Sequence, residues 1–231
     1  LSMNKILIVE DDCDLANITK IHLEHAGYQT AIASTCAEVL ELVADNEYDL
    51  ILLDMLLPDG DGHSVCTQIR KSRRLCPIIF MSCLSDSDNI INALKVGGDD
   101  YIVKPVNYDE LLARIQSNIR RSQHYKQETQ ENSHILKFKS FTINTALREV
   151  QIEGETINLS STEYDLLVYM TQHPDILVLY DELYHSVWDS DSLGDIRTVM
   201  VHISNLRKKI DSKKAGIIRT VRGAGYVFSN K

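Results

Sequence analysis

Four short apolar runs alternate with helix-length segments through the first half of this 231-residue chain. The runs occupy residues 6–9, 50–53, 78–81 and 101–103. Runs of this kind, separated by segments long enough for a helix, are typical of parallel strands that are buried on both faces of a sheet. Together with a further strand at residues 29–33, the pattern predicts a five-stranded α/β sandwich.

The segments between these strands are predicted to be helices, over residues 13–26, 35–47, 63–72, 85–96 and 108–126. Gly27, Gly97 and Gly98 fall at helix ends, where a left-handed residue is needed. Residues 123–133 lack apolar periodicity and are rich in Gln, Glu, Ser and Asn. We interpret them as a linker between a first domain at 3–122 and a second at 134–231.

A polar group follows each of the four apolar runs: Glu10 with Asp11, then Asp54, then Ser82, then Lys104 with Pro105. Ligands of parallel α/β sheets bind beyond the carboxyl ends of the strands, so these groups are expected to converge. Three carboxylates would repel one another there unless a divalent cation lay among them, and oxygen ligands suit Mg²⁺. We therefore predict a pocket for phosphoryl chemistry.

The second half of the chain has a different pattern. Short strands are predicted at 136–139, 141–144, 149–152 and 156–158, with a hairpin turn at Glu153–Gly154. A capping box from Ser160 to Glu163 begins a helix that ends near His173, and further helices are predicted at 180–187 and 195–210. Residues 217–220 and 226–228 flank a glycine turn, which predicts a two-stranded wing.

Charge is distributed unevenly along the chain. Residues 1–124 carry 11 bases against 19 acids, whereas residues 125–231 carry 13 against 14. Within the second half, residues 197–222 hold eight bases and only one acid, Asp211. Such a local positive region in an acidic protein indicates a surface for a polyanion.

Five cysteines without metal-ligand spacing favour reduced thiols in the cytoplasm. No apolar run approaches the roughly 20 residues that span a bilayer, so we expect no membrane partner. The eight histidines show no zinc-binding motif.

The chain resembles the OmpR/PhoB family of two-component response regulators over nearly its whole length. In the first half the similar segments are KILIVEDD at 5–12, DMLLPDGDG at 54–62 and GGDDYIVKP at 97–105. In the second half they are LSSTEY at 159–164, RTVMVHISNLRKKI at 197–210 and TVRGAGY at 220–226. The resemblance implies a flavodoxin-like receiver domain followed by an α+β winged helix-turn-helix domain.

In the receiver, the resemblance implies that Asp54 accepts a phosphoryl group from a phosphohistidine of a sensor kinase. Asp11, Asp54 and the carbonyl of Met55 would hold Mg²⁺ (or Mn²⁺), with Glu10 acting through water. Lys104, followed by a cis bond to Pro105, would bind the phosphoryl group. Ser82 would turn toward the acyl phosphate, which would let Tyr101 swing inward.

For DNA, the resemblance implies that the helix at 195–210 enters the major groove and the wing lies over the minor groove. The residues that match the family's DNA-contacting positions are Arg197, Thr198, His202, Ser204, Asn205, Arg207, Lys208, Arg222 and Tyr226. Asn205 is the strongest candidate for reading a base, because an Asn can pair with adenine through two hydrogen bonds. His202 can instead be a packed helix residue.

The resemblance also implies a homodimer on tandem half-sites of promoter DNA, and an interaction with RNA polymerase through the loop from Trp188 to Gly194. The positions that match the family's dimer face are Ile90, Ile91, Leu94, Asp100, Glu110, Leu112 and Arg114. The chain departs from the family at Val106, where members usually carry Phe, and at Ile90, where a base is common. Lys95 and Gln116 replace an acid–base pair, so the dimer would depend more on apolar residues.

Two alternative functions have different sequence requirements. A haloacid-dehalogenase-like phosphatase would need a second Asp two positions after its nucleophile, and that position is Leu56. A regulator whose receiver serves only for dimerisation, independently of phosphorylation, would not need the complete acidic pocket.

The positions two residues after Asp54 and two after Ser82 are Leu56 and Leu84. Neither side chain can orient a water molecule for attack on an acyl phosphate. The sequence therefore predicts a long-lived phosphorylated state.

Overall fold

The computed structural model describes residues 3–72, 75–127, 135–188, 196–211 and 216–229, with side chains of 123–127 excluded. It divides into two compact units, unit 1 at residues 1–119 and unit 2 at 120–231.

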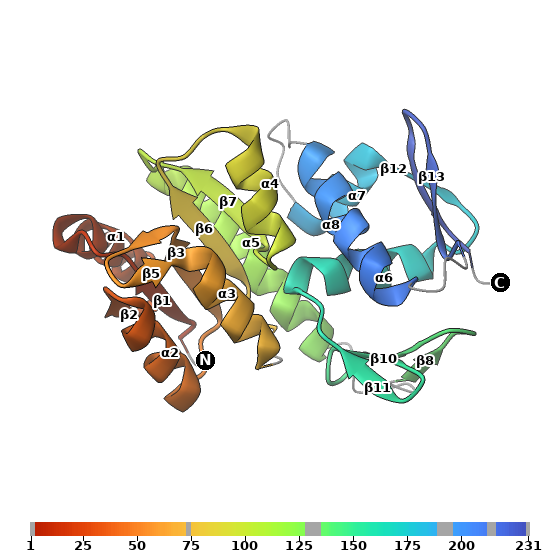
Figure 1. Ribbon diagram of the computed structural model, residues 1–231, viewed down its shortest axis with the longest axis horizontal. Coiled ribbons are helices and arrows are strands. Elements are labelled where there is room, and N and C mark those ends of the chain that lie inside the picture. Colours follow the sequence, from red (N-terminus) through yellow and green to blue (C-terminus); the bar gives the residue numbers. More distant parts are fainter. Residues whose placement is uncertain (1–2, 73–74, 128–134, 189–195, 212–215, 230–231) are drawn as a thin grey trace. The chain divides into compact units, whose positions relative to one another are not determined.

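Unit 1 is built around a five-stranded parallel sheet with the order β2-β1-β3-β6-β7 (Figure 1). The strands are β1 (Lys5–Val9), β2 (Gln29–Ala33), β3 (Leu50–Asp54), β6 (Ile78–Ser82) and β7 (Asp100–Val103). The connecting helices are α1 (Cys13–His25), α2 (Cys36–Asp45), α3 (Gly62–Lys71), α4 (Ser87–Lys95) and α5 (Tyr108–Gln127). The predicted parallel α/β sandwich is confirmed.

Two apolar layers cover the faces of this sheet. On one face, strand residues such as Leu53 and Phe80 pack with Val39 of α2 and Ile69 of α3. On the other, residues such as Ile8 pack with helices α1 and α5. Because both faces are covered, the five strands are apolar along most of their length.

The structure adds a short hairpin that the sequence analysis did not predict. Strands β4 (Leu56–Leu57) and β5 (Gly60–Asp61) pair antiparallel directly after β3. Two-residue strands are too short to produce a periodic pattern, which is why they were missed. This hairpin carries the chain from Asp54 to the start of α3.

The glycine predictions are confirmed at two of three positions. Gly27 and Gly97 have φ values of +92° and +111°, whereas Gly98 is not among the positive-φ residues. At Gly98 a Cβ would lie 2.7 Å from the ring of Phe80. The prediction for Gly98 was therefore wrong: the residue is small because an aromatic ring packs against its backbone.

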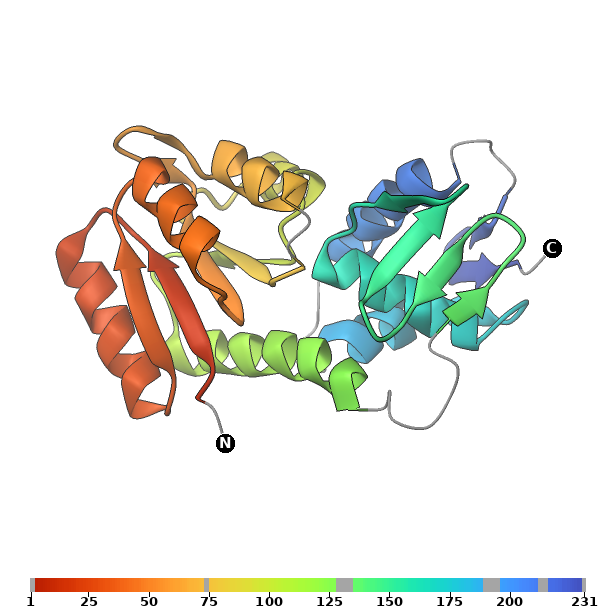
Figure 2. The same cartoon turned by 90° about the horizontal axis from the view of Figure 1, so that it is seen from below.

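In the described residues of unit 2, two sheets accompany helices that follow α5. The first sheet is antiparallel, with the order β11-β10-β9-β8, and its strands are β8 (Ile135–Lys137), β9 (Thr142–Asn144), β10 (Glu149–Ile152) and β11 (Glu155–Ile157). The helices are α6 (Ser161–Gln172), α7 (Tyr180–Trp188) and α8 (Ile196–Ile210). In Figure 2 the first sheet, in green, lies against these helices, and one apolar core joins them.

The sheet that contains the wing has one strand more than predicted. Strands β13 (Ile218–Val221) and β14 (Gly225–Phe228) form the expected hairpin, but β12 (Leu177–Leu179) pairs with the other side of β14. Only Val178 of β12 is buried, so this strand has a single inward residue and no recognisable alternation. The predicted two-stranded wing is therefore confirmed, and β12 is a third strand of its sheet that was not predicted.

Helix α6 begins with the predicted capping box. The Glu163 amide donates to Ser160 Oγ at 3.3 Å, and the Ser160 amide donates to Glu163 Oε2 at 2.9 Å. The same carboxylate oxygen accepts a hydrogen bond from Lys209 Nζ of α8 at 2.6 Å. Glu163 therefore joins the first turn of α6 to the last turn of α8.

Among the described residues, no helix is long and apolar enough to cross a membrane.

Candidate functional site

The ends of strands β1 and β3 bring three carboxylates together in unit 1. One oxygen of each of Glu10, Asp11 and Asp54 lies within 4.8 Å of the others. Glu10 and Asp54 are 2 % and 6 % exposed, whereas Asp11 is exposed to solvent. Parallel topology places these groups at one edge of the sheet, because both strands end there.

Lys104, which follows β7, contacts two of these carboxylates. Its Nζ atom lies 2.6 Å from Glu10 Oε2 and also donates a hydrogen bond to Asp54 Oδ2. Burial disfavours the ammonium, but hydrogen bonds and charge attraction from Asp54 and Glu10 outweigh it, so the pKa of Lys104 is raised. The Lys104–Pro105 peptide bond is cis.

The electrostatics of this pocket favour a cation. Burial raises the pKa of Glu10, the hydrogen bond and charge of Lys104 oppose that rise, and the charge of Asp54 adds to it. One ammonium faces three carboxylates, so the ionised cluster retains negative charge. Clustered carboxylate oxygens are ligands that Mg²⁺ prefers, and the residues present therefore fit a magnesium ion.

The chain after Asp54 is tightly constrained. The Gly62 amide donates to the carbonyl oxygen of Met55 at 2.9 Å, and a Cβ at Gly62 would lie 2.3 Å from the carbonyl oxygen of Asp54. The Leu56 amide donates to Asp54 Oδ1 at 3.1 Å, while the Leu56 side chain is 63 % exposed. The backbone amide of Leu56 thereby holds Oδ1 of the Asp54 carboxylate, and Lys104 holds Oδ2.

Asp59 anchors the β4–β5 hairpin to a distant helix. Its carboxylate accepts hydrogen bonds from the amides of Cys36 and Ala37, at 2.7 and 3.1 Å, in the first turn of α2. These amides lower the pKa of Asp59, while burial and the neighbouring carboxylates raise the pKa of the Cys36 thiol to about 11. This contact gives no local sequence signal, because its partners lie 22 and 23 residues from Asp59.

Ser82 and Tyr101 both interact with the segment after β6. Ser82 is 1 % exposed and its Oγ accepts a hydrogen bond from the Leu84 amide at 3.2 Å. The Tyr101 hydroxyl donates to the carbonyl oxygen of Leu84 and lies 3.5 Å from Met55 Sδ. Tyr101 is only 8 % exposed, so in this structure its ring is already directed inward, without a prior movement of Ser82.

The residues of helix α8 that were predicted to contact DNA differ in their exposure to solvent. Arg197, Ser204 and Lys208 are exposed, and Thr198 and Arg207 are partly exposed. His202 and Asn205, by contrast, are 0 % and 5 % exposed. The predicted base-reading role of Asn205 is therefore not supported by its position.

The side of α8 next to α7 explains this difference. The His202 ring lies 5.7 Å from the ring of Trp188, centroid to centroid. Asn205, three residues later, shares that side of the helix, since residues three apart are neighbours on a helical surface. Met200, which was not predicted, is 46 % exposed on the outer side.

The wing contains one exposed and one buried predicted residue. Arg222 is exposed beside Gly223, whose φ is +75°. Tyr226 is 3 % exposed and packs edge-on against Tyr180 of α7, with ring centroids 5.5 Å apart. Burial also raises the pKa of Tyr226. Tyr226, predicted to contact DNA, is instead a packing residue.

The predicted dimer face also differs from expectation. Leu94 is 1 % exposed, whereas Ile90, Ile91 and Leu112 are partly exposed. Arg114 pairs within the chain with Asp100 at 2.9 Å and with Glu110 at 2.8 Å. Leu94 is thus a buried residue, and Asp100 and Glu110 both pair with Arg114. Of the loop predicted to contact RNA polymerase, only Trp188 lies within the described residues, and it is 3 % exposed.

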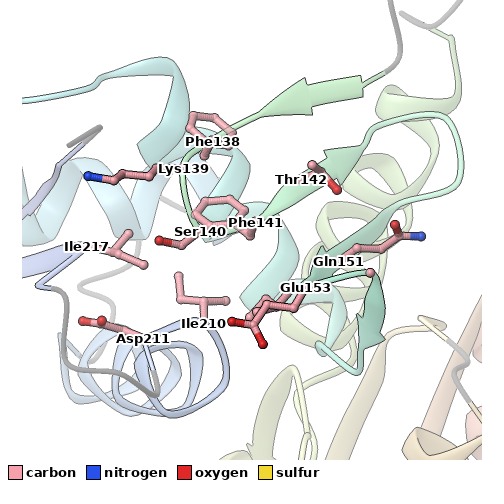
Figure 3. Close-up of a pocket in the computed structure, with 12 residues that line it drawn as sticks. Phe138, Lys139, Ser140, Phe141, Thr142, Gln151, Glu153, Ile210, Asp211 and Ile217 are labelled. Atoms are coloured by element: carbon pink, nitrogen blue, oxygen red, sulfur yellow. The ribbon is translucent and has the colours of Figure 1, made fainter.

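A cavity of about 560 Å³ in unit 2 lies apart from these residues (Figure 3). The β8–β9 connection, the β10–β11 hairpin and the end of α8 line it, with Phe141, Glu153 and Asp211 among the contributing side chains. None of the residues predicted for phosphoryl chemistry or DNA binding lines this cavity.

Comparison with known families gives two matches. Residues 6–116 match the response regulator receiver domain, and residues 154–228 match the family described as transcriptional regulatory protein, C terminal. The chain is 34 % identical over 233 residues to the transcriptional regulatory protein SrrA of Staphylococcus aureus (strain NCTC 8325 / PS 47), covering 99 % of this chain and 96 % of SrrA.

Two solved structures are similar over 99 % of this chain and 100 % of their own. One is a RitR mutant, with 26 % identity and a TM-score of 0.83. The other is the response regulator DrrB, a Thermotoga maritima OmpR/PhoB homologue, with 25 % identity and a TM-score of 0.53.

Proposed function

The chain belongs to the OmpR/PhoB-type two-component response regulators, and from this premise we propose that Asp54 is its phosphoacceptor, phosphorylated by a phosphohistidine of a sensor kinase. The observation that carries this proposal is the contact of Lys104 with both Asp54 and Glu10 inside the acidic cluster. Asp54 Oδ2 attacks the phosphorus atom, and the bond from phosphorus to the histidine nitrogen breaks.

Side chains of this pocket have separate roles in the transfer. Asp11, Asp54 and the Met55 carbonyl would hold Mg²⁺ (or Mn²⁺) directly and Glu10 would hold it through water, and the ion would neutralise charge on the phosphoryl oxygens. Lys104 keeps a positive charge beside Asp54 and binds a phosphoryl oxygen after transfer. The Leu56 amide orients the other carboxylate oxygen of Asp54, Oδ1.

Phosphorylation then changes the segment after β6. Ser82 turns its hydroxyl toward the acyl phosphate and releases the Leu84 amide, to which it is bonded here. Since Tyr101 also contacts Leu84, the movement is transmitted to the Tyr101 side chain in β7. This movement leads to dimerisation through Ile90, Ile91 and Leu112. In the dimer, Arg114 of each copy exchanges its own Asp100 and Glu110 for those of the other copy.

The dimer binds tandem half-sites in promoter DNA through unit 2, in the cytoplasm, and acts with RNA polymerase. Arg197, Ser204 and Lys208 present the exposed side of α8 to the major groove, and Arg222 reaches the minor groove. Each basic contact with a phosphate releases counterions, so affinity falls steeply with salt.

A phosphorylation-independent regulator is the alternative. Incubation of the full chain with acetyl phosphate and Mg²⁺, followed by intact mass and DNA titration, separates the two. We expect one added phosphoryl group, none in the presence of EDTA, and tighter binding to operator DNA identified by genomic mapping. Phosphorylation with unchanged DNA affinity and unchanged oligomeric state would favour the alternative.

A further inference from the structure

Arg207, near the end of α8, is attached to the wing at three points. Its Nε atom donates to the carbonyl oxygen of Ile218 at 3.0 Å, and Nη2 donates to Thr220 Oγ1 at 2.8 Å. Its guanidinium carbon lies 5.1 Å from the centroid of the Tyr226 ring. The side chain is partly buried as a result.

These three partners lie on both strands of the wing. Ile218 and Thr220 belong to β13, and Thr220 is paired in register with Tyr226 of β14. Tyr226 packs in turn on Tyr180 of α7. One guanidinium therefore connects α8 to the two wing strands, and through Tyr226 to the preceding helix.

The close packing at the base of the wing leaves little room for another arrangement. A Cβ at Gly225 would lie 2.0 Å from the carbonyl oxygen of Val178 in β12. The backbone of β14 thus lies directly against β12 on one side, while Arg207 contacts the hairpin from α8. The tip of the wing, with Arg222, extends beyond these contacts.

We propose that Arg207 sets the angle of the wing relative to α8, and is a positioning residue for DNA recognition and not one of the phosphate contacts. The inference rests on the DNA-binding role proposed above. Its consequence is that Arg222 reaches the minor groove at the correct distance only while Arg207 holds the hairpin.

The chemistry of Arg distinguishes this role from a simple positive charge. A planar guanidinium can donate to two acceptors and stack on an aromatic ring at once, whereas a Lys ammonium is a single point charge on a flexible stem. A phosphate contact tolerates Arg207→Lys much better than the three-point attachment does. Lys208, exposed on the next position of α8, is the matched control for loss of one charge.

The first test uses the free full chain and needs no DNA. Hydrogen exchange is measured on the β13–β14 hairpin for wild type and for the variants Arg207→Ala, Arg207→Lys, Thr220→Val and Lys208→Ala. We expect exchange in the hairpin to accelerate at least about tenfold in both Arg207 variants, less in Thr220→Val, and not in Lys208→Ala. Thr220→Val removes one hydrogen bond and keeps the assay informative if Arg207→Ala unfolds. Unchanged exchange in Arg207→Lys overturns the proposal.

The second test is a double-mutant cycle on operator DNA with Arg222→Ala. We expect Arg222→Ala to weaken binding at least about threefold more in wild type than in the Arg207→Lys background, because the wing is no longer held. Additive losses, or an Arg207→Lys protein with wild-type affinity, contradict the proposal. If wild type binds no DNA, the proposed DNA-binding role fails, and the exchange experiment still decides the role of Arg207.

Discussion

The acidic pocket of unit 1 and helix α8 of unit 2 present their functional side chains in different ways. In the pocket, each group follows the end of a parallel strand, and the order of the strands brings the groups to one edge. On α8, the groups lie around a helix, where consecutive residues point about 100° apart. The position of a strand end follows from topology, whereas the exposed face of a helix depends on what packs beside it.

This difference explains where sequence analysis succeeded. Glu10, Asp11, Asp54 and Lys104 come together although up to 94 residues separate them. On α8, Ser204 is exposed and its neighbour Asn205 is buried. An error of one residue in a predicted position matters little at the end of a strand. On a helix, the same error exchanges an exposed residue for a buried one.

The strongest test of the pocket is Asp54→Ala. We expect complete loss of phosphorylation by small phosphodonors, with DNA binding of the unphosphorylated protein retained. Intact mass measures the first and a DNA titration the second. Asp12→Ala is the control, because Asp12 caps α1 through the amides of Asp14 and Leu15. The Asp12→Ala protein should lose about 1 kcal/mol of folding stability and should still be phosphorylated. A phosphorylated Asp54→Ala protein would assign the acceptor elsewhere.

Leu56 offers a test of the exposed side of the pocket. Its side chain is 63 % exposed next to Asp54 and cannot bind water. We expect Leu56→Asn to shorten the lifetime of the phosphorylated state by up to about 100-fold, which corresponds to roughly 2.7 kcal/mol in barrier. Phosphate loss from purified protein in Mg²⁺ gives the rates. A wild-type half-life of seconds, or equal rates in the two proteins, argues against shielding by leucine.

Substitutions at two adjacent positions of α8 test most directly whether exposure on the helix decides DNA contact. Ser204→Ala should change sequence preference at one base pair, by about 1 kcal/mol, whereas Asn205→Ala should mainly lower the melting temperature. Binding to a set of single-base operator variants, together with thermal unfolding, separates the outcomes. If Asn205→Ala alone relaxed base preference, Asn205 would have to leave its buried position when DNA binds.

The smallest expected effect comes from Asp59→Asn. The hydrogen bonds from Cys36 and Ala37 lower the pKa of Asp59. The ionised carboxylate therefore stabilises the folded state at pH values above the ordinary pKa of an Asp. This contribution is lost as pH falls through the lowered folded pKa. The stability difference between wild type and Asp59→Asn should therefore shrink in acid. Thermal unfolding at pH 7 and near pH 3 measures it, and a pH-independent difference would exclude the charged contact.

Strands with strong apolar patterns were predicted well. The predicted strand at 29–33 agrees with β2 residue for residue, and the apolar runs at 50–53 and 101–103 fall within β3 and β7, each one residue short of the strand. Strands β4 and β5 were missed because two residues show no alternation, and β12 was missed because its three residues are all apolar. Burial of Tyr226 and Leu94 could not be predicted, because it depends on neighbours distant in sequence.

Glu163 links a local signal to a long-range contact, and this has a consequence for folding. The carboxylate that completes the cap of α6 also binds Lys209 of α8, 46 residues away. Helix initiation at Ser160 and docking of α8 are thus stabilised by the same oxygen atom, so neither is complete without the other. The C-terminal unit should consequently fold as one cooperative step, in which the amides of the first turn of α6 become protected together with those of α8.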